Sequence, residues 1–103
     1  LVRMYADRIN RQYQPKAIVL YGSQARGCAR ADSDIDVAVL WPGYLDAGRK
    51  VEAHLWGLAD DVDARIEPVL ITRLDRSFAF IREICKHGIV ISGSADLLNE
   101  TAG

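Results

Sequence analysis

Residues 17–40, AIVLYGSQARGCARADSDIDVAVL, contain two apolar runs separated by a loop of small, polar and charged residues. The first run, 17–21, and the second, 34–41, are rich in β-branched and aliphatic residues, a composition typical of strands. The glycines and small polar residues of 22–33 favour an irregular connection. We therefore predict two strands that pair with each other across this loop.

Asp34 and Asp36 stand at the beginning of the second predicted strand. Because side chains alternate between the two faces of a strand, both carboxylates should project to the same side. Two like charges so close together repel each other, and a hard divalent cation with oxygen ligands removes that repulsion. The alternative is a solvated strand entry, but the neighbouring loop favours Mg²⁺ binding by both residues.

That loop begins with Gly22 and Ser23, directly after the first strand, where we expect a short helix to start. A turn of this kind can direct backbone N–H groups at a phosphate, and Gly22 would permit close approach. Ser23 adds a hydroxyl donor, and Arg26 adds a forked guanidinium. A Gly-Ser pair alone is typical of an ordinary turn, but next to the aspartates it favours phosphate binding. We predict nucleotide binding by Gly22, Ser23, Arg26 and Ser33.

The rest of the chain carries three further helical patterns and two further strand patterns. Helices are predicted over 2–13, 51–62 and 78–85, and strands over 65–72 and 89–91. Pro15 ends the first helix, Pro68 places the third strand at a sheet edge or a bulge, and Gly88 caps the last helix. The order α-β-β-α-β-α-β predicts one α/β (α+β) domain over 1–103, a small mixed sheet covered by helices.

Glu67 lies in the third predicted strand, where the surrounding pattern calls for burial. It could complete a carboxylate triad with Asp34 and Asp36. Three carboxylates that hold two Mg²⁺ ions can bind a nucleoside triphosphate and stabilise the leaving pyrophosphate. The competing explanation is a charge that protects a sheet edge, and Asp61 and Asp63 compete as the third carboxylate.

Composition narrows the class of protein. The chain has 103 residues, half of them apolar, and a net charge of −1, which argues against extended nucleic-acid binding. Its apolar runs are shorter than the roughly 20 residues of a membrane-spanning helix. Cys28 and Cys85 lack the dense spacing of secreted scaffolds and are expected to be free thiols, so together with the absence of a leader segment they favour the cytoplasm. Exposed sheet edges would allow a homo-oligomer.

The motif GSQARG at 22–27, followed by SDIDVAVL at 33–40, resembles the signature of the polymerase beta nucleotidyltransferase superfamily, in particular its minimal nucleotidyltransferase (MNT) branch. The resemblance covers most of the chain, although only 18–40 is specific. It implies that Gly22 and Ser23 bind triphosphate and that the two aspartates bind metal. A third carboxylate on a later strand would help to activate the acceptor, and Glu67 matches that position, where many members carry aspartate.

The resemblance also implies a function. Small members of this branch are often the antitoxin of a toxin–antitoxin pair whose other half is a HEPN-domain ribonuclease. We therefore expect a Mg²⁺-dependent enzyme that transfers AMP from ATP to a hydroxyl, on tyrosine, of a HEPN-type partner. One alternative is a non-catalytic nucleotide-binding antitoxin or regulatory subunit. Another is transfer to a small molecule such as an aminoglycoside, although larger relatives of that kind carry an additional helical domain.

Overall fold

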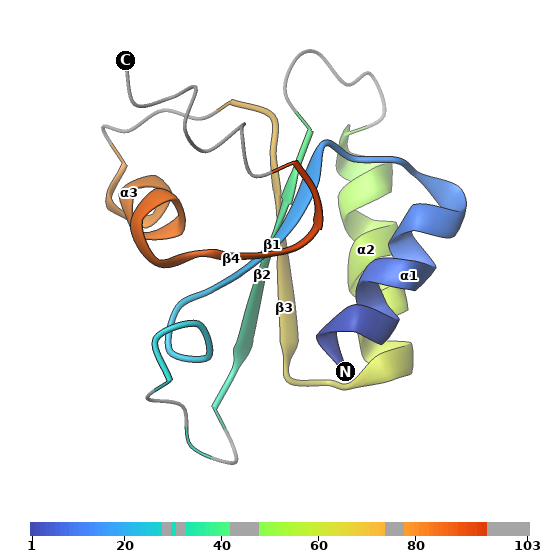
Figure 1. Ribbon diagram of the computed structural model, residues 1–103. Helices are drawn as coiled ribbons and strands as arrows, with labels where there is room; N and C mark the ends of the chain where they lie inside the picture. The colour runs from blue at the N-terminus through green and yellow to red at the C-terminus, as the bar shows by residue number, and fades with distance from the viewer. Residues whose placement is uncertain (28–29, 31–32, 42–47, 74–77, 95–103) are drawn as a thin grey trace.

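The computed structural model describes residues 1–27, 30, 33–41, 48–73 and 78–94. Within them the chain forms helices and strands in the predicted order (Figure 1). The elements are α1 (Val2–Gln12), β1 (Ala17–Tyr21), β2 (Ile35–Leu40), α2 (Gly48–Val62), β3 (Ile66–Ile71), α3 (Ala79–His87) and β4 (Ile89–Gly93). The predicted bounds differ from these by a residue or two at most element ends, where hydrogen bonding fades.

The strands form one mixed sheet in the order β3-β2-β1-β4. β1 runs antiparallel to both β2 and β4, which confirms the predicted pairing of the first two strands. β2 and β3 are parallel, and α2 makes the crossover between them. β3 is therefore an edge strand, which is one of the two positions predicted from Pro68. Proline has no backbone N–H to donate, and an edge strand leaves one side of the ladder unpaired.

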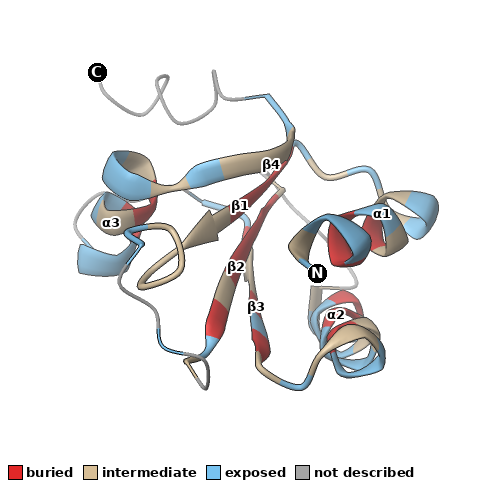
Figure 2. Ribbon diagram, turned by 60° about the horizontal axis from the view of Figure 1, so that its bottom comes forward, coloured by how far each residue is buried: buried red, intermediate tan, exposed pale blue. Residues whose placement is uncertain are grey.

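Helices cover both faces of the sheet, so the protein has two small cores. α1 and α2 lie on one face and α3 lies on the other, as Figures 1 and 2 show. Because strand residues alternate, Ile18 and Val37 pack with Tyr5 of α1 and Leu55 of α2. The strand residues that alternate with these point to the other face and pack against α3. The buried side chains of this second core are Ala17, Val19, Ala38, Leu40 and Ile71 of the strands and Ile81 and Ile84 of α3.

Gly88 caps α3, as predicted, but its φ of −63° is one that any residue adopts. Space explains the glycine. A Cβ atom at Gly88 would overlap the carbonyl oxygen of Ile84 and the side chain of Val19. The missing side chain therefore lets the chain pass from α3 directly into β4 while α3 stays against β1.

Two remaining expectations concern thiols and membranes. Cys85 is half-buried in α3, and Cys28 lies outside the described residues. No helix in the described part of the chain has the length and apolar character needed to cross a membrane.

Candidate active site

Strand pairing brings the two halves of the predicted carboxylate cluster together. Asp36 of β2 pairs with Tyr21 of β1 on one side and with Glu67 of β3 on the other. Residues in register on neighbouring strands, about 4.8 Å apart, present their side chains on the same face. That face is the one covered by α3, because Ala38, two residues after Asp36, packs in the α3 core. Asp34 is exposed and lies one alternation before Asp36.

The charges in this cluster act on one another. Desolvation and then the charge of Asp34 raise the pKa of Asp36 above its ordinary value of 3.8. The pKa of Glu67 is raised above 4.5 by desolvation and then by Asp34 and Asp36. Burial, followed by the charges of Asp36 and Glu67, raises the pKa of Tyr21 to about 12, so its hydroxyl stays protonated at neutral pH. The cluster is a place of concentrated negative charge.

Gly22 lies directly against this cluster. Its φ of +72° is in the left-handed region that favours glycine. A Cβ atom there would overlap Oδ2 of Asp36. The turn after β1 thus brings its backbone into contact with the carboxylate, so the two predicted motifs, Gly-Ser and Asp-x-Asp, form one site.

The expected short helix after Gly22 was wrong, because residues 22–27 form a turn. The N–H of Arg26 donates to the carbonyl of Gly22 at 3.1 Å, and the N–H of Gly27 donates to that of Gln24 at 3.3 Å. Gly27 also has a positive φ, of 73°, which ends the turn before a helix can propagate. Over residues 22–27 the site therefore offers the amides of a turn and not those of a helix N-terminus.

Arg26 and Ser33 contact other parts of the protein in this structure. The Nε atom of Arg26 lies 3.5 Å from Oε1 of Glu83 in α3. The hydroxyl of Ser33 accepts a hydrogen bond from the N–H of Arg30 at 2.8 Å, and the N–H of Ser33 donates to the carbonyl of Arg30 at 3.1 Å. Their roles in nucleotide binding, like that of Ser23, remain predictions.

Asp61 and Asp63, the competing third carboxylates, lie elsewhere. Asp61 is exposed in the last turn of α2, on the other side of the sheet. Asp63 accepts hydrogen bonds from both Nε and an Nη of Arg65, at 3.0 and 2.9 Å. Those bonds, with one from the backbone N–H of Arg65, lower the pKa of Asp63 to about 2. Asp63 is thus paired with its own cation, and Glu67 is the carboxylate that shares a face with Asp36.

Whether the cluster suits a metal ion depends on its donors. Among the described residues, no three His, Cys, Asp or Glu side chains converge closely enough to enclose an ion by themselves. Mg²⁺ does not need such a cage, since in nucleotide sites it takes one or two carboxylates together with phosphate oxygens and water. Hard oxygen donors whose charges repel one another fit an ion that arrives with a triphosphate.

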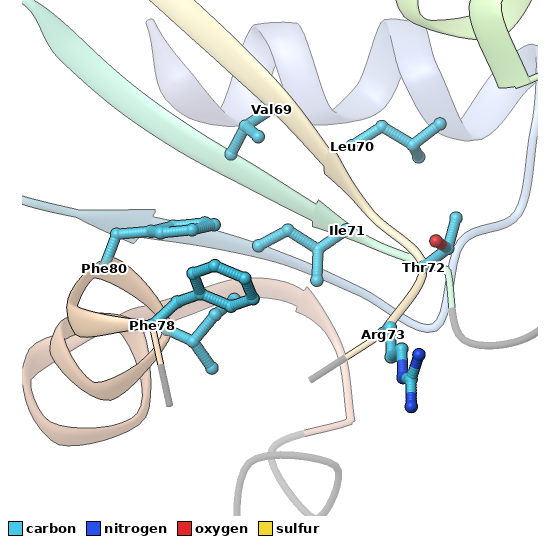
Figure 3. Close-up of a pocket in the computed structure, with 8 residues that line it drawn as sticks. Val69, Leu70, Ile71, Thr72, Arg73, Phe78 and Phe80 are labelled. Carbon is cyan, nitrogen blue, oxygen red and sulfur yellow. The ribbon is translucent and has the colours of Figure 1, made fainter. Parts of the chain in front are cut away.

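An apolar pocket of about 240 Å³ opens further along the same face. Figure 3 shows Val69 and Ile71 of β3 facing Phe78 and Phe80 at the beginning of α3. The pocket contains none of the predicted site residues, because Glu67 is near the start of β3 and the pocket lies towards its end. The candidate active site is therefore the polar surface around Asp36 and not this apolar pocket.

Two residues of this site did not stand out in the sequence, Tyr21 and Glu83. Tyr21 reads as the last residue of an apolar strand, and only its pairing with Asp36 places it in the cluster. The sequence did not indicate a role for Glu83, because a glutamate is ordinary in an amphipathic helix. Its position between Ile81 and Ile84 could have indicated a side chain at the border of the packed face.

One protein family and several solved structures are similar to this chain. The family model described as polymerase beta, nucleotidyltransferase matches residues 6–96. A search of curated protein sequences found no match. Among solved structures, the chain is similar to a crystal structure of a toxin–antitoxin with AMP-PNP, with 27% identity, a TM-score of 0.68, and coverage of 99% of this chain and 82% of the other.

Two further structures extend the comparison. A mutant toxin–antitoxin complex that contains MntA has 25% identity and a TM-score of 0.63 over 98% of this chain and 82% of its own. A chain from the complex of a tri-AMPylated Shewanella oneidensis HEPN toxin with an MNT antitoxin has 21% identity and a TM-score of 0.55, over 99% of this chain and 87% of its own. At that identity, the last similarity shows the fold alone.

Proposed function

Because this chain belongs to the polymerase beta nucleotidyltransferase family, we propose that it is an antitoxin enzyme that transfers AMP from ATP to a hydroxyl group of a HEPN-type toxin. The nucleotide is proposed from the relative that was crystallised as a toxin–antitoxin with AMP-PNP, an ATP analogue. The more distant relative with the same fold, bound to an AMPylated HEPN toxin, indicates which acceptor to test first.

One observation carries the proposal: the backbone of Gly22 lies against the carboxylate of Asp36, which itself lies between Tyr21 and Glu67. A triphosphate bound at the turn after β1 would have a phosphorus atom next to the carboxylates. Transfer then requires only that the acceptor hydroxyl approach in line, because positioning and charge stabilisation supply most of the catalysis of phosphoryl transfer.

The residues of the site divide this work between them. Asp34, Asp36 and Glu67 are the proposed ligands of two Mg²⁺ ions. In such sites the ions neutralise the phosphate oxygens and the leaving pyrophosphate, and they favour loss of the acceptor's proton. Nucleotidyl transfer forms a bond between the acceptor oxygen and the α-phosphorus and breaks the bond from that phosphorus to pyrophosphate, while the hydroxyl proton is released.

The other half of the site holds the triphosphate. Gly22 allows the phosphates to approach the backbone, and Ser23 and Arg26 supply hydroxyl and guanidinium donors. Ser33, which directly precedes Asp34, is also proposed to bind the nucleotide. Its hydrogen bonds with Arg30 stabilise this end of the loop.

The proposal is tested by following a label from ATP to the partner. Purified protein is incubated with Mg²⁺, ATP labelled at the α-phosphate and a candidate HEPN-type partner protein. Wild type is compared with Asp34→Asn plus Asp36→Asn, and with Asp61→Asn as a matched loss of one carboxylate outside the site. Label on the partner is expected with wild type and Asp61→Asn, and it should disappear when Mg²⁺ is chelated.

Other outcomes identify the alternatives. If the doubly substituted protein neutralises the toxin as well as wild type does, the chain acts by binding, as a nucleotide-binding antitoxin. Transfer of label to an aminoglycoside and not to protein would establish a small-molecule acceptor. Label from the γ-phosphate and not from the α-phosphate would refute nucleotidyl transfer.

A further inference from the structure

A side chain of α3 reaches the turn after β1, to which we assign phosphate binding. Figures 1 and 2 both place the turn after β1 next to α3. Oε1 of Glu83 lies 3.5 Å from Nε of Arg26, although the two residues are far apart in the sequence. The apolar residues of α3 pack on the sheet, so they do not explain why a carboxylate faces this turn.

The Glu83 oxygen has an unusual environment. Oε1 is shielded from solvent and accepts no hydrogen bond within the described part of the chain. A shielded carboxylate oxygen without a donor is costly, so a cation beside it is favoured. The contact of 3.5 Å is longer than the 2.7–2.9 Å of a charge-assisted hydrogen bond. Glu83 therefore attracts the guanidinium without fixing it by a short bond.

The contact also leaves part of the guanidinium accessible. It joins Glu83 to the inner nitrogen, Nε, whereas arginine commonly grips phosphate with a pair of parallel N–H bonds. The Arg26 side chain is 48% exposed, and that of Glu83 is 28% exposed. One edge of the guanidinium thus faces α3, and the rest remains open to solvent beside the turn.

We propose that Glu83 is a positioning residue that holds Arg26 beside the turn so that its guanidinium can bind the triphosphate. This inference rests on the proposed function, since it takes the triphosphate as the ligand of Arg26. Holding a long side chain in place before the ligand arrives reduces the ordering cost of binding. The opposite effect, in which Glu83 competes with phosphate for Arg26, predicts the opposite response to substitution.

A double-mutant cycle separates these effects. The affinity for ATP with Mg²⁺ is measured by calorimetry for wild type, Glu83→Gln, Arg26→Ala and the double variant, and the melting temperature is recorded for each. Arg26→Ala should weaken ATP binding roughly 10- to 100-fold, the range for loss of a charge-assisted bond. Glu83→Gln should weaken it roughly three- to tenfold in the wild-type background and leave it unchanged in the Arg26→Ala background.

Two controls accompany the cycle. Glu83→Asp, which keeps the charge but shortens the side chain, should lie between wild type and Glu83→Gln. Glu52→Gln removes an exposed glutamate from α2, on the other face of the sheet, and should change nothing.

Each result decides the inference. An equal loss of affinity from Glu83→Gln in both backgrounds would mean a general structural role and would overturn it. Tighter ATP binding by Glu83→Gln would also overturn it, in favour of competition. If wild type binds no ATP, the inference fails together with the proposed function. If ATP binds with the expected coupling but no acceptor is labelled, the positioning role stands and the proposed transfer fails.

Discussion

Gly22 and Gly27 offer a matched pair for testing the contact between the turn and the carboxylate. Both have a left-handed φ, of 72° and 73°, so alanine meets the same backbone penalty at each, about 1–2 kcal/mol. They differ in their surroundings. A Cβ atom at Gly22 overlaps Oδ2 of Asp36, whereas at Gly27 it meets no described atom within 4 Å. The difference between the two alanine variants therefore isolates the contact with Asp36.

The overlap should add about 1–3 kcal/mol at Gly22, the usual cost of an inserted group in a packed site. Each kcal/mol corresponds to about 4–8 °C in the melting temperature of a domain of this size. We therefore expect Gly27→Ala to lower the melting temperature by roughly 4–16 °C and Gly22→Ala to lower it clearly further. AMP transfer should persist in Gly27→Ala and be lost in Gly22→Ala, because the displaced carboxylate belongs to the site.

The assay is thermal unfolding followed by circular dichroism, with transfer measured below the transition. A third protein, Gly22→Ala with Asp36→Ala, should recover most of the additional loss of stability without recovering activity. The reasoning is refuted if Gly22→Ala and Gly27→Ala have the same melting temperature and the same activity, because the Cβ overlap would then have no effect.

Three further predictions follow from the site and the core. Asp36→Asn should abolish transfer yet stabilise the Mg²⁺-free protein at pH 7. The pKa values of Asp36 and Glu67 are raised in the folded protein, so these two carboxylates bind protons more tightly there than in the unfolded chain. Urea titrations should therefore show that stability falls as the pH rises from about 4 through the folded-state pKa values. Mg²⁺ and ATP should make this fall less steep. Glu67→Gln should lower kcat at least about 100-fold, as loss of a transition-state charge contact does, whereas Asp63→Asn should keep it; equal kcat values would exclude Glu67 as the third carboxylate. Tyr5→Phe removes the 2.9 Å hydrogen bond from its hydroxyl to the Leu55 carbonyl between α1 and α2 and should cost about 1 kcal/mol in urea unfolding, with unchanged transfer per folded molecule.

Local patterns were sufficient for the helices and strands. The apolar and β-branched composition of Asp34–Leu40, the helical spacing of α1, α2 and α3, and the breaks at proline and glycine depend on residues within a few positions of one another. For the same reason Pro68 alone could limit the third strand to a sheet edge or a bulge, and the structure places it at the edge. The expected helix after Gly22 failed because two positive-φ glycines close a turn there, and no periodicity in so short a segment indicates this.

The site shows the limit of local patterns more clearly. Asp34 and Asp36 could be predicted on one face because they are two residues apart where the second strand begins, with Asp34 directly before β2 and Asp36 within it. For the third carboxylate the sequence favoured Glu67 but left Asp61 and Asp63 as competitors, since all three are acidic and close together in the sequence. The register between β2 and β3 places Glu67 beside Asp36.

The sequence by itself determined the class of fold, the order of its elements and the two motifs to which we assign the chemistry, because these depend on short-range periodicity and residue type. Only the tertiary structure decided that Glu67 pairs with Asp36, that Gly22 touches the same carboxylate and that Glu83 faces Arg26. Each of these contacts depends on the register between strands or on the packing of α3. Register and packing are set by burial across the whole sheet, and no single segment contains that information.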